Sequence, residues 1–165
     1  MPVNLELKLK VDSHLKYIYL LKKANAENKG VLKQKDIYYR WKKGLLKLRI
    51  EGDSATLIKY VRAEKGKRWS NFDLMRLTGE NPEKYFDDLL TVEAVVEKKR
   101  KLYFWNNTRV HLDEVKGLGK FLELETLFIS TRADMEKRFT DTIAMLGLDL
   151  SKQIRKSYKN ILTGT

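Results

Sequence analysis

The chain has 165 residues, 42% hydrophobic and 34% charged, which suits one folded domain over residues 1–165 and excludes a disordered chain. It has no cysteine, which excludes disulfides, thiolate metal sites and a cysteine nucleophile. It also has no signal-peptide pattern and no apolar run near the ~20 residues that span a bilayer, so we expect a cytoplasmic protein without a membrane partner. The formal net charge of +12 attracts anions, with nucleic acid as the first candidate and phosphate-rich small molecules next.

The predicted elements begin with a strand and a helix. Polar and apolar residues alternate strictly from Asn4 to Val11, a pattern typical of a half-buried strand. Asp12 or Ser13 can cap a helix that follows, with Gly30 just past its end. The apolar face of this helix, which we expect to pack outside a sheet, would consist of Leu15, Ile18, Tyr19 and Leu21.

The middle of the chain predicts four more strands and a short helix. The strands cover residues 35–39, 45–51, 55–62 and 68–74. The second and third of them are joined by a Gly-containing segment, which indicates a hairpin. Pro82 can open a helix to about residue 90, since proline is tolerated in the first turn.

Three strands and two helices complete the chain. The strands cover residues 92–104, 108–115 and 121–128, with turns at Asn106-Asn107 and at residues 117–119. Ser130 or Thr131 can cap a helix that ends at Gly147, and a last short helix lies around residues 156–162. The predicted fold class is α+β, with about eight mostly antiparallel strands and helices outside them.

Charged residues form a row on one face of four predicted strands. The rows are Asn4, Glu6, Lys8 and Lys10; Lys47 and Arg49; Arg109, His111 and Asp113; and Glu123 and Glu125. In an open sheet these rows would form a solvated face, and composition alone gives that arrangement about even weight. In a closed barrel of about eight strands they would line the lumen. The charges would then converge on one cavity, which a polyanion with a divalent metal would stabilise.

The mixture of charges bears on which anion the protein binds. Basic residues recur at strand spacing along the chain, interleaved with acids such as Glu6 and Asp113. A surface that tracks nucleic acid has no need of carboxylates directed at its ligand, whereas a site for phosphate and Mg²⁺ needs both signs. Nucleic acid is therefore the less favoured partner.

Several motifs are shared with one known family. They are the segments 4–8, 35–39, 46–49, 57–62, 66–72, 96–100, 111–125 and 156–158. On these motifs, which span nearly the whole chain, the sequence resembles the CYTH domains, also called triphosphate tunnel metalloenzymes. That family includes class IV adenylyl cyclases, thiamine triphosphatases and inorganic triphosphatases. The segment from His111 to Glu125 is the most specific match, because of its length and spacing.

The resemblance implies an eight-stranded antiparallel tunnel in which acids hold Mg²⁺ or Mn²⁺ and bases hold a triphosphate. By position, the metal ligands would be Glu6, Asp113, Glu123 and Glu125. The phosphate ligands would be Lys8, Arg49, Arg62, Arg68, Lys98, Arg100 and Lys156. The central catalytic set would be Glu6, Lys8, Glu123 and Glu125. The sequence departs from the E-x-E-x-K pattern of the family at Asn4, and the loss of one negative oxygen ligand leaves open whether one or two ions bind.

Other charged residues have less certain positions. Lys10, Lys47, Lys59 and Arg109 would lie at the rim or face outward. His111 shares the face of Asp113 and could carry a proton, but a histidine beside acids is more often a hydrogen-bonded structural group, and we favour that interpretation.

Three functions fit the predicted site. The one we favour is a metal-dependent enzyme that hydrolyses a phosphoanhydride bond of a triphosphate, such as ATP, tripolyphosphate or thiamine triphosphate. An alternative is a class IV adenylyl cyclase, in which the ribose 3′-hydroxyl attacks the α-phosphate and pyrophosphate leaves. A non-catalytic module that binds polyphosphate or nucleotide is a third possibility. The sequence by itself predicts no oligomeric state.

Overall fold

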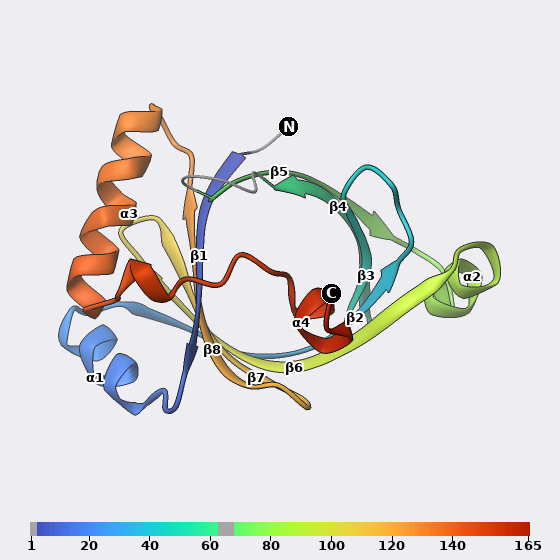
Figure 1. Ribbon diagram of the computed structural model, residues 1–165, viewed down its shortest axis with the longest axis horizontal. Helices are drawn as coiled ribbons and strands as arrows, with labels where there is room; N and C mark the ends of the chain where they lie inside the picture. Colours follow the sequence, from blue (N-terminus) through green and yellow to red (C-terminus); the bar gives the residue numbers. More distant parts are fainter. Residues whose placement is uncertain (1–2, 63–67) are drawn as a thin grey trace.

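Eight strands close into an antiparallel barrel in the order β1-β5-β4-β3-β2-β6-β7-β8 (Figure 1). The computed structural model describes residues 3–62 and 68–165, and only the backbone of Arg62, Arg68 and Trp69. The strands are β1 (Val3–Val11), β2 (Glu27–Tyr39), β3 (Leu45–Glu51), β4 (Ser54–Arg62), β5 (Arg68–Leu77), β6 (Val92–Trp105), β7 (Thr108–Val115) and β8 (Gly119–Leu127). This confirms the predicted α+β class and excludes the open sheet.

The helices lie outside the barrel wall or across one end of it. They are α1 (Leu15–Lys23), α2 (Pro82–Leu89), α3 (Arg132–Leu146), the short 3₁₀ helix η1 (Leu150–Lys152) and α4 (Tyr158–Thr163). Figure 1 shows α1 and α3 together beside β1 and β8, α2 on the opposite side, and α4 close to the rim of the barrel. Within the described ranges, no helix combines the length and the apolar character needed to cross a membrane.

The alternation along β1 explains how one strand serves two environments. Leu5, Leu7 and Leu9 point outward into a buried cluster that includes Leu21 of α1 and Met135 of α3. Each such leucine stabilises the fold by about 1.5–3 kcal/mol through burial of apolar surface. The intervening polar side chains must then face the lumen, because successive residues of a strand point to opposite sides.

The strand register brings the charged rows together. Glu6 of β1 lies opposite Glu125 of β8, and Lys8 lies opposite Glu123. Across the next pair of strands, His111 of β7 lies opposite Glu123. The expectation that these rows face one another is therefore confirmed.

The first helix differs from its prediction. His14 is its N-cap and makes no capping hydrogen bond through its side chain, whereas the predicted candidate Ser13 accepts a hydrogen bond of 3.2 Å from the amide of Leu15, the first residue of the helix. Leu15 and Tyr19 are 76% and 64% exposed, so the predicted apolar face packs on the core through Leu21, which is buried, and Ile18, which is partly buried. Gly30 lies within β2, at an irregularity in the β2–β6 pairing, and not at the end of the helix. The helix is short because the chain turns at Asn25, which has a positive φ of 56°, and returns at once as a strand.

The helix α3, which follows the last strand, agrees closely with its prediction. The Thr131 side chain accepts a hydrogen bond from the amide of Asp134, and Gly147 ends the helix in the left-handed conformation. The short helix η1 that follows had no counterpart in the sequence prediction. It places the last segment of the chain across the end of the barrel.

Candidate active site

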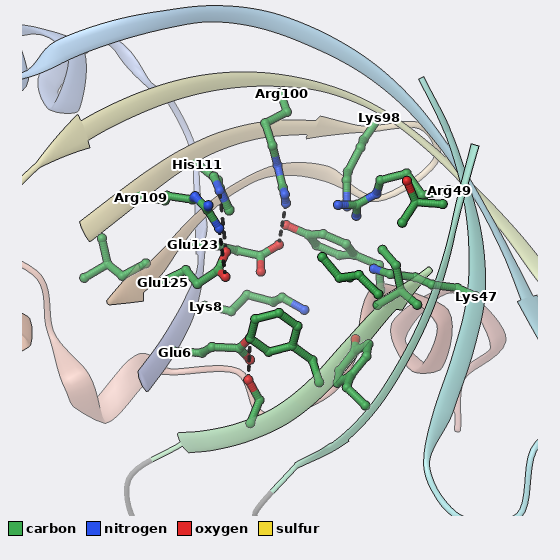
Figure 2. A pocket seen from close by; sticks show the side chains of 18 of the residues that line it. Glu6, Lys8, Lys47, Arg49, Lys98, Arg100, Arg109, His111, Glu123 and Glu125 are labelled. Carbon is green, nitrogen blue, oxygen red and sulfur yellow. Dashed lines mark hydrogen bonds and ion pairs between the residues drawn. The ribbon is translucent and has the colours of Figure 1, made fainter. Parts of the chain in front are cut away.

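A charged cavity of about 240 Å³ occupies the lumen of the barrel (Figure 2). Side chains from every strand contribute to its lining. Among the described residues, the ionisable side chains of this lining are Glu6, Lys8, Tyr38, Lys47, Arg49, Glu51, Tyr60, Lys98, Arg100, Arg109, His111, Glu123, Glu125 and Tyr158. Figure 2 shows that the carboxylates Glu6, Glu123 and Glu125 lie on one side and that Lys47, Arg49 and Lys98 lie on the other.

The carboxylate side is built by β1 and β8. Ser70 Oγ donates a hydrogen bond of 2.9 Å to Glu6, and Asn4 Nδ2 donates to Glu125. Burial raises the pKa of Glu125, and the charges of Glu6 and Glu123 raise it further against the opposing effect of Arg109. Burial also disfavours the charged form of Glu123, but Lys8 and Arg100 outweigh it and hold its pKa well below the usual range.

The cation side is organised by one buried aspartate, Asp36 of β2. Its carboxylate accepts two hydrogen bonds of 2.8 Å from Arg49 and one of 3.1 Å from Lys47. Lys98 Nζ lies 3.4 Å from the same carboxylate. Although burial opposes ionisation of Asp36, these three cations hold its pKa well below its usual value. Burial lowers the pKa of Lys47 well below normal and that of Lys98 to about 8.

A second buried carboxylate fixes Arg100, which lies between the two sides. Asp113 accepts two hydrogen bonds from the Arg100 guanidinium, of 2.7 and 2.6 Å. Asp113 also accepts one of 2.8 Å from the Tyr158 hydroxyl. Arg100 in turn donates a bond of 3.2 Å to Glu123. The bidentate pairing holds the planar guanidinium in one orientation toward the cavity.

The C-terminal segment closes one end of the cavity. The amide of Ile154 donates to the carbonyl of Lys8 at 2.8 Å, and Lys8 Nζ donates to the carbonyl of Lys156 at 3.0 Å. The Lys8 ammonium lies 4.0 Å from the centre of the Tyr158 ring. The segment therefore orients a buried cation of β1 through both its backbone and an aromatic face.

A comparison with protein-family models decides the affiliation. The CYTH domain model matches residues 3–158. The chain belongs to the CYTH domain family. Triphosphate tunnel enzymes of the CYTH family bind triphosphate substrates and generally depend on a divalent metal. No curated protein matches the chain by sequence.

Solved structures of CYTH-like proteins share this fold. The PH1012 protein from Pyrococcus horikoshii is 23% identical, with a TM-score of 0.84 and 95% and 98% of the two chains covered. A candidate adenylate cyclase from Vibrio parahaemolyticus is 19% identical, with a TM-score of 0.77 and 97% of each chain covered. HpAC1 from Hippeastrum, which has a dominant triphosphatase activity, is 12% identical, with a TM-score of 0.67 and 100% and 97% covered. These likenesses show the common fold.

The CYTH barrel brings most of the predicted site residues to the cavity. Among the predicted ligands, those that line it are Glu6, Lys8, Arg49, Lys98, Arg100, Glu123 and Glu125. Asp113 lies behind Arg100, fully buried, and outside the lining. The Lys156 side chain is exposed, and the backbone carbonyl of this residue is what contacts Lys8. The side chains of Arg62 and Arg68 lie outside the described residues, so their predicted roles stay predictions.

The less certain residues divide between the two faces of the CYTH barrel. Lys47, Arg109 and His111 line the cavity, whereas Lys10 and Lys59 are exposed. His111 Nε2 lies 4.0 Å from Glu125. Burial and the nearby Arg100 lower the pKa of His111 well below its usual value. Burial therefore favours the neutral form of His111, and the structural role that we favoured for it stays a prediction.

Sequence reasoning missed Asp36 and the contribution of Tyr158. Asp36 belongs to a family motif but has no role in the prediction, although an acid directly before the apolar and aromatic run from Ile37 to Tyr39 signals a buried ionic partner. Tyr158 was noted only as part of a closing motif. Its place over Lys8 depends on how the C-terminal segment crosses the barrel, which no local pattern encodes.

The donor set of this CYTH cavity suits a hard divalent cation. Glu6, Glu123 and Glu125 supply carboxylate oxygens. Burial is the main reason that the pKa of Glu125 is raised, and a cation would neutralise the negative charge of Glu6 and Glu123 that adds to this effect. Among the described residues, no three His, Asp or Glu side chains form a ready-made metal cluster. Mg²⁺ is commonly bound by one or two carboxylates together with substrate phosphates, so such a cluster is not required.

Proposed function

We propose that this protein is a divalent-metal-dependent triphosphatase whose single domain comprises residues 1–165. The observation that carries the proposal is the separation of charge inside one cavity, with three carboxylates facing three cations across the lumen (Figure 2). A bound triphosphate needs cations along its length and carboxylates where a metal ion joins it. The arrangement supports a substrate that lies across the lumen between these two sides.

In the proposed reaction, the oxygen of a water molecule forms a bond to the terminal phosphorus. The bond between that phosphorus and the bridging oxygen breaks, diphosphate leaves with the electron pair, and the proton of the water is released to solvent. Lys8, Arg49 and Arg100 would bind the phosphate oxygens and stabilise the charge that grows on the leaving group. Asp36 would orient Arg49, and Asp113 would orient Arg100, without touching the substrate.

The metal would be held by Glu6, Glu123 and Glu125, with Mg²⁺ or Mn²⁺ favoured by the all-oxygen donor set. When bound, it would supply Lewis-acid neutralisation of phosphate charge. The two oxygens of Asp113 already accept three hydrogen bonds from Arg100 and Tyr158. We therefore favour a positioning role for Asp113 over the predicted role as a metal ligand.

The direct test is a panel of tripolyphosphate, ATP and thiamine triphosphate, each incubated with Mg²⁺ or Mn²⁺ and analysed for phosphate, pyrophosphate and cyclic AMP. Release of phosphate is the expected result. Cyclic AMP with pyrophosphate would identify the cyclase instead. Tight binding of tripolyphosphate without any product would identify a binding module.

Glu123→Gln and Glu125→Gln test the carboxylate side. Each substitution removes a negative oxygen donor while keeping the size of the side chain, and we expect turnover to fall by at least about 10²-fold with the fold intact. Glu27→Gln, an exposed glutamate paired with Lys29, is the matched control and should keep full activity. Full turnover in both cavity variants would exclude this metal site.

A further inference from the structure

Asn4 is a buried amide on the carboxylate side of the cavity. It is 3% exposed and lies on the same face of β1 as Glu6, two residues further along the strand. Its Nδ2 donates a hydrogen bond to Oε1 of Glu125 on the neighbouring strand β8. A neutral donor therefore lies directly beside the proposed metal ligands.

The hydrogen bonds of Glu125 decide which of its oxygens a metal ion can reach. Oε1 accepts from Asn4 and also from Nη1 of Arg109, at 3.3 Å (Figure 2). Both donors direct N–H groups at this oxygen and would repel a cation that approached it. Oε2 lies 4.0 Å from Nε2 of His111, beyond hydrogen-bond distance. Glu125 can therefore offer Oε2 to a metal ion, but not Oε1.

Space does not prevent a second ion from binding beside Asn4. Asn4 and Arg109 line a hollow of about 550 Å³ at the N-terminal end of β1. Among the described residues that line this hollow, none is an acid. A second ion would therefore find room there but no negative ligand, which Mg²⁺ and Mn²⁺ require.

The charges beside the carboxylates also favour a single ion. Glu123 accepts a hydrogen bond from Arg100, and Glu125 pairs with Arg109. Two of the three proposed metal ligands are thus already partly neutralised by an arginine. A second divalent ion would add two positive charges to this site without a further carboxylate to balance them.

We propose that Asn4 limits the cavity to one divalent cation, because its amide donor occupies Glu125 Oε1 at the place where a carboxylate would help to hold a second ion. The single ion is then held by Glu6, Glu123 and Oε2 of Glu125. This proposal rests on the metal site of the proposed function, and it fixes at one the number of ions that the sequence leaves open.

Titration of the protein with Mn²⁺ alone counts the ions without requiring turnover. Free Mn²⁺ gives an electron paramagnetic resonance signal that is lost when the ion binds to protein, and we expect one bound Mn²⁺ per chain. Glu123→Gln, which removes a proposed ligand, should lose this ion. Two ions per chain in the wild type would overturn the proposal, as would no binding or full retention of the ion by Glu123→Gln.

Asn4→Asp identifies the residue responsible. It keeps the size of the side chain and replaces the amide donor by a carboxylate oxygen, so we expect two Mn²⁺ per chain. Asn71→Asp adds the same charge at an exposed position of the neighbouring strand β5 and should keep one. One ion per chain in Asn4→Asp would overturn the role of Asn4.

Thermal stability gives a second readout for the same variant. Without metal, the introduced carboxylate faces Glu125 in a buried contact, so Tm should fall by about 3–6 °C. Saturating Mn²⁺ should raise the Tm of Asn4→Asp by more than that of the wild type, because an additional ion binds the folded state. An equal rise in both proteins would contradict a second ion. Asn4→Glu, whose longer side chain the adjoining hollow can accommodate, gives a second variant with the same expected count.

The two proposals fail separately in these experiments. Two Mn²⁺ per chain in a wild-type protein that releases phosphate from triphosphates would overturn the role of Asn4 and leave the triphosphatase. One ion in the wild type and two in Asn4→Asp, without release of phosphate, would support the role of Asn4 and overturn the triphosphatase.

Discussion

The Asp36 carboxylate is the residue on which the cation side of the cavity depends. It is fully buried and is the shared partner of Lys47, Arg49 and Lys98. Without it, three positive groups would face one another in a medium of low dielectric constant, where like charges repel strongly. In the proposed site, Asp36 would therefore govern how substrate is bound without contacting it.

Asp36→Asn should consequently lower the free energy of unfolding by about 3–5 kcal/mol, because it leaves buried cations without their counter-charge. Urea denaturation measures this loss. Asp73→Asn, in the exposed pair with Lys59, is the control and should cost less than about 1 kcal/mol. If Asp36→Asn were as stable as that control, Asp36 would not organise the cluster.

Lys98 gives the cavity a dependence on pH. Burial, reinforced by Arg100, lowers its pKa to about 8, so its positive charge is lost as pH rises through that value. The affinity for ATP should therefore fall above pH 8, by up to about tenfold for one charge-assisted hydrogen bond. Titration of the Kd between pH 7.5 and 9.5 measures the change. Lys98→Gln should flatten it, whereas Lys99→Gln, at the exposed neighbouring position, should not.

Deprotonation of Lys98 has the opposite effect on the stability of the free protein from its effect on affinity. Its pKa in the folded state lies below the value of 10.5 in the unfolded chain, so the unfolded state binds more protons between about pH 8 and 10.5. The contribution of Lys98 to stability therefore rises with pH across that window while affinity falls. A parallel decrease of both would contradict the assignment of this pKa to Lys98.

Among the elements, the segment that leads into α4 does the most to complete the site. Ser157 caps α4 by accepting a hydrogen bond from the amide of Asn160, which fixes the position of Tyr158 at the start of the helix. Tyr158 then contacts Asp113 through its hydroxyl and Lys8 through its ring. A six-residue helix is thus held by a buried polar contact more than by its own length.

Tyr158→Phe separates these two contacts, since it removes the hydroxyl and keeps the ring over Lys8. We expect the free energy of unfolding to fall by about 1.5–3 kcal/mol through loss of one hydrogen bond to a buried carboxylate. Chemical denaturation measures it, with Tyr19→Phe, whose side chain is largely exposed, as the control. Equal stability of the two variants would mean that the hydroxyl bond contributes nothing.

Strands with strict alternation could be predicted from the sequence, and β3 and β7 have the predicted bounds. The first half of β2 could not, because residues 27–34 are mostly polar and become a strand by pairing with β6. The same limit applied to the site. Glu6, Glu123 and Glu125 were identified from motifs. The contact of Asp36 with Lys98 depends on the pairing of β2 with β6, and that of Asp113 with Tyr158 depends on the path of the C-terminal segment, so both join residues distant in sequence.

At the scale of the whole molecule, the net charge of +12 does not describe the cavity. Among the described residues its lining has six lysines and arginines and four glutamates, with Asp36 and Asp113 directly behind it. The two signs therefore nearly balance among the described residues of the lumen, and most of the excess positive charge lies elsewhere. In the proposed function, a short anion with a metal would complement the lumen, whereas a long polyanion would meet only the outside.

Ligand-induced stabilisation distinguishes these two kinds of binding. Tripolyphosphate with Mg²⁺ at about 100 times its Kd should stabilise the folded state by about 2.7 kcal/mol. For a chain of this size that raises Tm by about 5–10 °C. At 0.15 M salt, interactions between exposed charges are screened beyond about 8 Å. Because the cavity is buried, the shift in Tm should persist at this salt concentration when the ligand is kept at the same multiple of its Kd.

A short DNA duplex should produce no comparable shift in Tm and should not compete with tripolyphosphate, since it cannot enter the barrel. Protection by the duplex that tripolyphosphate reverses would place nucleic acid in the same site and overturn this view of the cavity.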